Sequence, residues 1–113
     1  MHEMALCAAI LEQLEEQARA QNFQYVKQLW LEIGSLSGVD TEALRFGFEL
    51  ACRGTLAEGA RIHIEHTPGR GWCPHCQAEM PLNSLLEACP GCAGYGLEIT
   101  AGKALRIKQL EVN

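Results

Sequence analysis

Two pairs of cysteines constrain this chain more than any other feature of its sequence. Residues 72–76 read WCPHC and residues 89–92 read CPGC, with twelve residues between the inner cysteines. Two C-x2-C pairs at such a separation are typical of a zinc site, because each pair turns tightly enough to present both sulfurs to one ion. The predicted zinc ligands are Cys73, Cys76, Cys89 and Cys92.

A site with four cysteine ligands is structural rather than catalytic. Four thiolates complete a tetrahedral shell and leave no open position for water or substrate. The surrounding segment, residues 68–102, holds four of the six cysteines and reads as an insert between two strands. About 35 residues bury too little surface to fold alone, so the metal must contribute much of the folding free energy. A thioredoxin-like redox pair and two disulfides are the alternatives, but neither explains two knuckles.

The remaining residues predict an α+β fold. From Met4 onward, apolar residues recur at the spacing of an amphipathic helix. Residues 26–34 alternate apolar and polar positions as a half-buried strand does, and residues 60–67 and 106–113 predict two more strands. A second helix follows Asp40 or Thr41, since either side chain can cap it. The expected domains are residues 1–67 plus 103–113, with residues 68–102 as a zinc ribbon.

Charge and hydropathy exclude several classes of protein. The net charge of -5 repels phosphate, which disfavours nucleic-acid binding. The apolar run over residues 4–11 is too short to span a membrane, and no basic residue precedes it as in a signal peptide. We therefore expect a cytoplasmic protein that binds neither membranes nor nucleic acid. In that compartment cysteines are metal ligands or buried thiols more often than disulfides, and Cys7 and Cys52 are expected to be small core residues.

The amino terminus offers a second set of metal ligands. The terminal amine, the His2 amide nitrogen and the His2 imidazole can reach one ion, and Glu3 can supply a fourth donor. Square-planar nitrogen and oxygen ligation favours Ni(II) or Cu(II). The alternative is a frayed end in which Glu3 only complements the helix dipole. His75, inside the first knuckle, is either an exposed turn residue or an auxiliary ligand and pH sensor.

These motifs together resemble the HypA/HybF family of hydrogenase nickel-incorporation proteins. The similarity rests on MHEMALC at the start, WLEIGSLSGVDTEALRFGFELACRGTLAEGA in the middle and the paired C-x2-C motifs. It covers nearly the whole chain, and the M-H-E start is its most specific part.

The resemblance implies a fold and a function. The expected fold is two helices on a three-stranded antiparallel sheet with an inserted zinc ribbon. The expected function is that of a nickel metallochaperone, not an enzyme, in which His2 and Glu3 bind the transported Ni(II) and the four cysteines hold structural Zn(II). Family members tend to carry an acid at the position of Asp40, so this residue is either a helix cap or a neighbour of the nickel.

The resemblance also implies partners. They are a HypB-type GTPase and the hydrogenase large-subunit precursor, and some relatives also serve urease maturation. We expect a monomer or a weak homodimer. The rival hypotheses are a zinc-ribbon nucleic-acid binder, which the negative charge opposes, and a zinc hydrolase, which needs an open ligand position.

Overall fold

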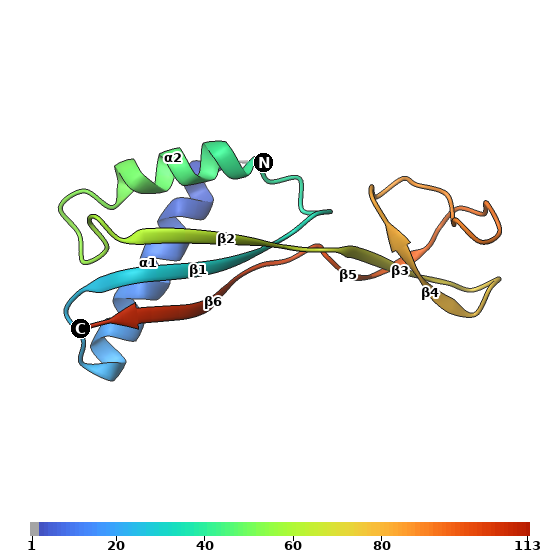
Figure 1. Cartoon of the computed structure of the whole chain (residues 1–113). Helices are drawn as coiled ribbons and strands as arrows, with labels where there is room; N and C mark the ends of the chain where they lie inside the picture. The colour runs from blue at the N-terminus through green and yellow to red at the C-terminus, as the bar shows by residue number, and fades with distance from the viewer. Residues whose placement is uncertain (1–2) are drawn as a thin grey trace. The chain divides into compact units, whose positions relative to one another are not determined.

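The computed structural model describes residues 3–113 of the chain, which form two helices and six strands (Figure 1). No helix in this range is long and apolar enough to cross a membrane. In chain order the elements are α1 (Glu3–Gln21), β1 (Val26–Gly34), α2 (Thr41–Ala51), β2 (Arg61–Thr67), β3 (Gly69–Cys73), β4 (Ala78–Leu82), β5 (Glu98–Ala101) and β6 (Leu105–Val112).

The strands form two three-stranded sheets, with orders β2-β1-β6 and β4-β3-β5. In the second sheet β3 pairs antiparallel with both neighbours. In the first sheet, a hydrogen bond joins Gln28 of β1 to Glu111 of β6, and another joins Tyr25 to Asn113, the residues next to these strands, so the two strands run in opposite directions. The fold class of two helices with a three-stranded sheet is confirmed, and the expectation of an antiparallel sheet holds for the β1–β6 pair.

Strand β2 departs from that expectation because it runs parallel to β1. Gln28 meets His63, and the Ser35 N–H donates to the Thr67 carbonyl, so contacts advance together along the two strands. The physical reason is the connection between them. A helix, α2, carries the chain from the end of β1 back to its start, and such a crossover links parallel strands.

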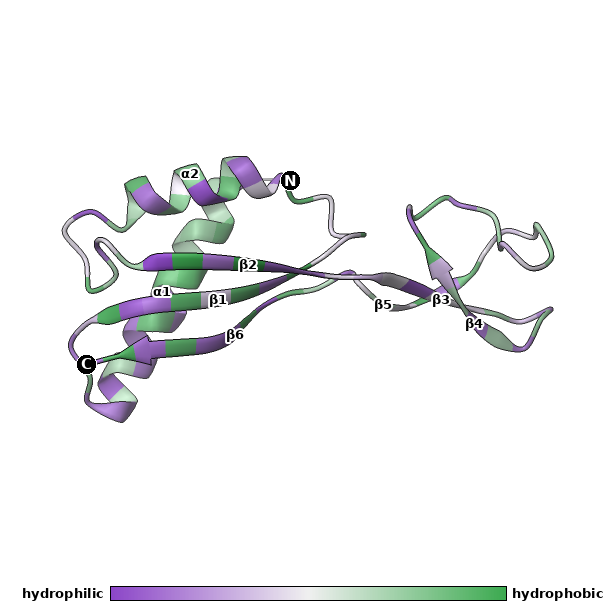
Figure 2. Cartoon of the chain, viewed as in Figure 1, coloured by the Kyte–Doolittle hydropathy of each residue, from purple (hydrophilic) through white to green (hydrophobic). Residues whose placement is uncertain are grey.

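The helices bury most of the apolar positions that the sequence predicts, although Met4 at the start of α1 is 61% exposed. Strand β1 alternates buried and half-buried positions from Leu29 to Ile33, and Figure 2 shows the same alternation of apolar and polar residues. Helix α1 ends beside Asn22, whose φ of 58° is left-handed. Asn tolerates this conformation at a helix end. Buried side chains of the two helices and of β1 supply much of this core: Cys7, Ile10, Leu14, Leu44, Phe48, Leu29 and Leu31.

Backbone contacts divide the chain into two compact units. The first comprises residues 1–31, 39–64 and 107–113, and the second comprises residues 32–38 and 65–106. The second unit thus holds the four predicted zinc ligands together with the end of β1. The assignment of residues 1–67 plus 103–113 to nickel and 68–102 to zinc stays a prediction.

Three glycines of the second unit approach one another so closely that none leaves room for a side chain. We call Gly34, Gly69 and Gly102 the glycine crossing. A Cβ at Gly34 would lie 2.0 Å from the Gly102 carbonyl oxygen, and a Cβ at Gly102 would lie 2.5 Å from the Gly69 Cα. The Leu36 N–H also donates to the Gly102 carbonyl at 2.8 Å. The end of β1 therefore belongs to the second unit because its backbone lies directly against the backbone at Gly102.

We expect Gly102→Ala to destabilise the protein much more than Gly96→Ala. Both glycines have left-handed φ angles, 88° and 84°, but a Cβ at Gly96 meets nothing within 4 Å. Gly96→Ala should therefore cost only the backbone strain, about 1–2 kcal/mol. Gly102→Ala adds the clash with backbone atoms that cannot move aside, a further ~1–3 kcal/mol or more. Urea unfolding of both variants measures the difference, and equal losses would show that the crossing is not crowded.

Candidate metal centre

The four cysteines of the paired motifs converge at one point of the second unit, and we call them the four-cysteine cluster. Their sulfur atoms all lie within 4.8 Å of one another. The Sγ atoms of Cys73 and Cys92 are 3.6 Å apart, and those of Cys76 and Cys89 are 3.9 Å apart. A tetrahedral zinc ion with Zn–S bonds of about 2.3 Å would hold its sulfurs roughly 3.8 Å apart. The donor set and its spacing therefore fit a tetrahedral metal ion.

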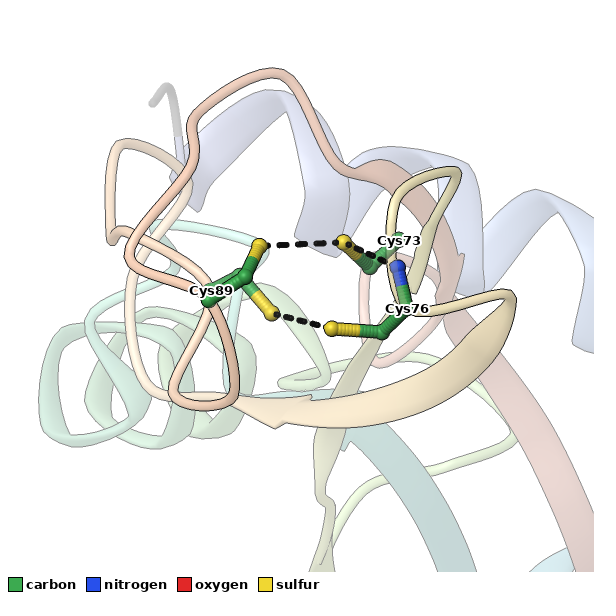
Figure 3. A group of neighbouring side chains, drawn as sticks. Cys73, Cys76 and Cys89 are labelled. Atoms are coloured by element: carbon green, nitrogen blue, oxygen red, sulfur yellow. Dashed lines mark hydrogen bonds between the residues drawn. The ribbon is translucent and has the colours of Figure 1, made fainter.

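Each knuckle is shaped by backbone N–H groups that point at sulfur. The Cys76 N–H donates to the Cys73 Sγ at 3.4 Å, and the Gly91 N–H donates to the Cys89 Sγ at 3.3 Å. Figure 3 shows Cys73 and Cys76 facing Cys89 across the site. A Cβ at Gly91 would lie 3.2 Å from the Cys76 Sγ, so the absence of a side chain there lets the second knuckle close over the sulfurs.

The thiols of this cluster differ strongly in their ease of ionisation. The hydrogen bond from the Cys76 backbone lowers the pKa of Cys73 to about 7. Burial, followed by the neighbouring thiols of Cys92 and Cys73, raises the pKa of Cys76 to about 12. Four thiolates in so small a volume would repel one another unless a cation lay between them. The cluster is therefore suited to a bound metal ion, whose charge lets all four sulfurs ionise.

His75 is exposed in the turn between Cys73 and Cys76. This agrees with the prediction of an exposed turn residue, the first of the two alternatives for His75. Its ring carbon Cδ2 lies 3.9 Å from the point that a Cβ on Gly94 would occupy. Of the four thiols nearby, that of Cys92 is the exposed one, while Cys73 and Cys89 are buried. The role of His75 as an auxiliary ligand or sensor stays a prediction.

The two remaining cysteines lie in the core of the first unit, as predicted. Cys7 is fully buried and its Sγ lies 3.6 Å from the Leu44 carbonyl oxygen. Burial raises the pKa of the Cys7 thiol, and it raises that of Cys52 to about 11. Both residues therefore remain neutral thiols near neutral pH and act as small apolar side chains.

The predicted amino-terminal site lies only partly within the described residues. His2 lies outside them, whereas Glu3 is the first residue of α1. The Asp40 N–H donates to the Glu3 Oε2 at 3.2 Å. A residue predicted as a ligand and the residue predicted as its possible neighbour are therefore in direct contact, although they are far apart in the sequence.

Asp40 is the N-cap of α2. Its Oδ1 accepts hydrogen bonds from the N–H groups of Glu42 and Ala43, both at 3.1 Å. These bonds satisfy first-turn N–H groups that have no partner within the helix. Capping, one of the two predicted roles of Asp40, is thus present, and it uses the oxygen Oδ1.

Sequence reasoning missed a polar cluster on the first sheet. The His63 ring stacks on Trp30 with ring centres 4.7 Å apart, and its Nε2 lies 2.7 Å from the Gln28 Oε1. Gln28 in turn donates to Glu111. The alternation of residues in β1 and β2 puts Gln28, Trp30 and His63 on one face of the sheet. Their contact could not be predicted from the sequence, because it depends on the parallel direction of the two strands.

Comparison with known proteins identifies relatives that match the whole chain. The family described as "Hydrogenase/urease nickel incorporation, metallochaperone, hypA" matches residues 1–112. Hydrogenase maturation factor HypA of Azotobacter chroococcum mcd 1 is 52% identical to this chain over 112 residues, which cover 99% of both proteins. Hydrogenase maturation factor HypA of Azotobacter vinelandii is 50% identical over 112 residues, again 99% of both proteins. The solution structure of the Ni metallochaperone HypA from Helicobacter pylori has a similar fold, with a TM-score of 0.75 and 24% identity over 99% of this chain and 97% of that one.

The cap predicts a stability difference between two substitutions of Asp40. Asp40→Ala removes the acceptor for two N–H groups and should cost about 1 kcal/mol of unfolding free energy, whereas Asp40→Asn keeps an acceptor and should cost at most a few tenths. Both variants keep the backbone N–H that reaches Glu3. Urea unfolding without added metal tests this, and an equal loss in the two variants would show that the carboxylate acts other than as a cap.

Proposed function

The chain belongs to the HypA family of hydrogenase/urease nickel-incorporation metallochaperones, and on that premise we propose that it carries Ni(II) at its amino terminus. The nickel is cargo. The proposed ligands are the terminal amine, the His2 amide nitrogen and imidazole, and a donor of Glu3. Square-planar nitrogen-rich ligation of this kind suits Ni(II), and zinc removes a backbone amide proton poorly.

The observation that carries this assignment is the hydrogen bond from the Asp40 N–H to the Glu3 carboxylate. It ties the first residue of α1 to the N-cap of α2 and supports a site at that corner of the first unit. The Asp40 Oδ1 is used in capping, so we assign its Oδ2 to the nickel or to a ligand of the nickel. Glu3 and Asp40 would then supply the negative charge that a divalent cation needs.

The same corner opposes a cation in one respect. The N-termini of two helices carry partial positive charge from the helix dipole, and α1 and α2 both begin here. The carboxylates of Glu3, Asp40 and Glu42 offset that charge. The remaining attraction for Ni(II) then comes from the chelating donors and from Asp40, and a partner can displace these ligands one by one. A metallochaperone needs this kind of reversible binding.

We assign structural zinc to the four-cysteine cluster. Cys73, Cys76, Cys89 and Cys92 would hold it, and their spacing and sulfur chemistry support the assignment. When bound, zinc supplies the positive charge that lets four thiolates share one small volume. With no ligand position open, the ion does no catalysis and the protein is not an enzyme.

The family role also suggests the other participants. We propose that the protein acts in the cytoplasm, where six free thiols stay reduced, and that it passes nickel to a hydrogenase large-subunit precursor with the help of a HypB-type GTPase. Transfer takes place by ligand exchange, so no bond of a substrate is made or broken.

The nickel proposal predicts that His2→Ala weakens Ni(II) binding at least about tenfold, because it removes the imidazole that closes the chelate. Zinc content and thermal stability should stay at the parent values. The matched control is His66→Ala, which removes an exposed imidazole of β2 and should leave nickel affinity unchanged. Calorimetric titration of untagged protein measures both. If the His2→Ala variant binds nickel as tightly as its parent, the proposed nickel site is wrong.

Two further arms of that titration identify the other ligands. A tag ahead of Met1 turns the terminal amine into an amide and should abolish the square-planar d–d absorbance. Asp40→Asn should lower nickel affinity if Oδ2 contacts the nickel or its ligands, while the cap stays intact. Unchanged affinity in Asp40→Asn would restrict Asp40 to its capping role.

The zinc proposal predicts about one zinc ion per purified chain, held by the four cysteines. Cys73→Ala should lose it and unfold the second unit, while the helices of the first unit persist because they have their own core. Cys52→Ala, a buried thiol of the first unit, is the control and should keep its zinc. Metal analysis and circular dichroism test both, and full zinc retention by Cys73→Ala would contradict the ligand assignment.

A further inference from the structure

The first two turns of α1 lie against α2 within the first unit. The Glu3 carboxylate accepts a hydrogen bond from the Asp40 N–H at 3.2 Å, and the Cys7 Sγ lies 3.6 Å from the Leu44 carbonyl oxygen. Cys7 is fully buried, whereas Glu3 is half-buried. The contact of Glu3 with Asp40 is therefore at the solvent-exposed end of this helix pair, where one hydrogen bond alone gives little order.

Gly47 leaves a notch on the side of α2 that faces α1, and the Met4 side chain lies over it. A Cβ at Gly47 would lie 3.0 Å from the Met4 Sδ and 3.5 Å from the Cys7 Sγ, so both sulfur atoms lie against the bare backbone of α2. Gly47 is buried in the interior of α2, where glycine is unfavourable for a helix. The close approach of the two helices is the physical reason for a glycine at this position.

Met4 can hold the start of α1 because of where it lies in the helix. It follows Glu3 directly, and its side chain is 61% exposed, with the sulfur over Gly47 among its covered atoms. The first turn of a helix has N–H groups without partners inside the helix, so it frays unless side chains fix it. A flexible thioether fills an irregular gap such as this notch well. The contact that fixes Met4 therefore also fixes Glu3.

From these contacts we infer that Met4, seated in the Gly47 notch, is a positioning residue for the proposed nickel site. It keeps the first turn of α1 helical against α2, and so keeps the Glu3 carboxylate within reach of the Asp40 N–H. The proposed chelate uses Glu3 and the two residues before it, so a fixed start of α1 presents its donors together. This role rests on the nickel function proposed above, and it gives Met4 no bond to the metal.

The size of the effect depends on how many molecules have the start of α1 in place. The apparent affinity for nickel falls in proportion to that fraction. Without the Met4 side chain the first turn should fray in most molecules, and nickel affinity should fall about fivefold. The core of the first unit lies farther along the helices, among buried side chains such as Leu14 and Phe48. Fraying of one helix end is a local opening, so the global free energy of unfolding should change little.

The test compares Met4→Ala with Met4→Leu in the untagged full-length protein. Met4→Leu keeps an apolar side chain over Gly47 and should bind nickel nearly as tightly as the parent. The matched control is Tyr25→Ala, which truncates another exposed residue of the first unit, 56% exposed and just before β1. Calorimetric titration measures nickel affinity. Exchange of the Asp40 amide proton with solvent, followed by NMR without metal, should be about fivefold faster in Met4→Ala and unchanged in the other two variants.

Three results would overturn this role of Met4. The first is an Asp40 amide that exchanges equally fast in Met4→Ala and the parent. The second is unchanged nickel affinity in Met4→Ala while His2→Ala loses affinity. The third is a loss of global stability, in urea unfolding, as large as the loss of nickel affinity, since Met4 would then be an ordinary structural residue. Nickel binding by His2→Ala at the parent affinity contradicts the nickel proposal instead, and amide exchange without metal still decides whether Met4 holds the start of α1.

Discussion

The convergence of four sulfur atoms, which can all ionise only around a cation, is the constraint on which the second unit depends. Its apolar core is small, because Ile33, Leu36 and Leu82 are its buried aliphatic side chains, next to the buried thiols of Cys73 and Cys89. So few groups give little hydrophobic stabilisation. The sheet β4-β3-β5 and the two knuckles would therefore draw much of their stability from the proposed zinc ion, which turns the four sulfurs into ligands. Without it the four side chains are thiols that contribute little to holding the unit together.

The first unit has a different source of stability, and this distinguishes the two proposed metal sites. Helices α1 and α2 bury a full apolar face against the sheet, so this unit needs no metal to fold. Its amino-terminal corner can therefore gain and lose an ion without a change of fold. The contact between Glu3 and Asp40 places the start of one helix against the cap of the other, so part of the proposed nickel site is fixed before any cargo arrives. A binding site that is partly formed in advance loses less entropy on binding.

Much of this arrangement was predictable, since local pattern determines it. The alternation in residues 26–34 gave the bounds of β1, and the spacing of Leu44 and Phe48 gave the buried face of α2. The four-cysteine cluster could also be predicted, because each pair of cysteines lies in one short turn and a turn is local structure. What pattern could not reveal were contacts set by tertiary packing. The parallel direction of β2, the bond from Asp40 to Glu3 and the three strands of the second sheet all depend on pairing between distant residues.

The glycine crossing has a consequence for the order of folding. Gly34, Gly69 and Gly102 come from three distant parts of the chain, so their contact must wait until three segments have arrived, which is slow. Once formed, it holds the two ends of residues 69–102 together, since the Gly102 and Gly69 backbones touch. That closes the loop in advance and removes part of the entropy that the knuckles would otherwise lose on coming together. The crossing and the proposed metal therefore support each other, since both close the same segment of the chain.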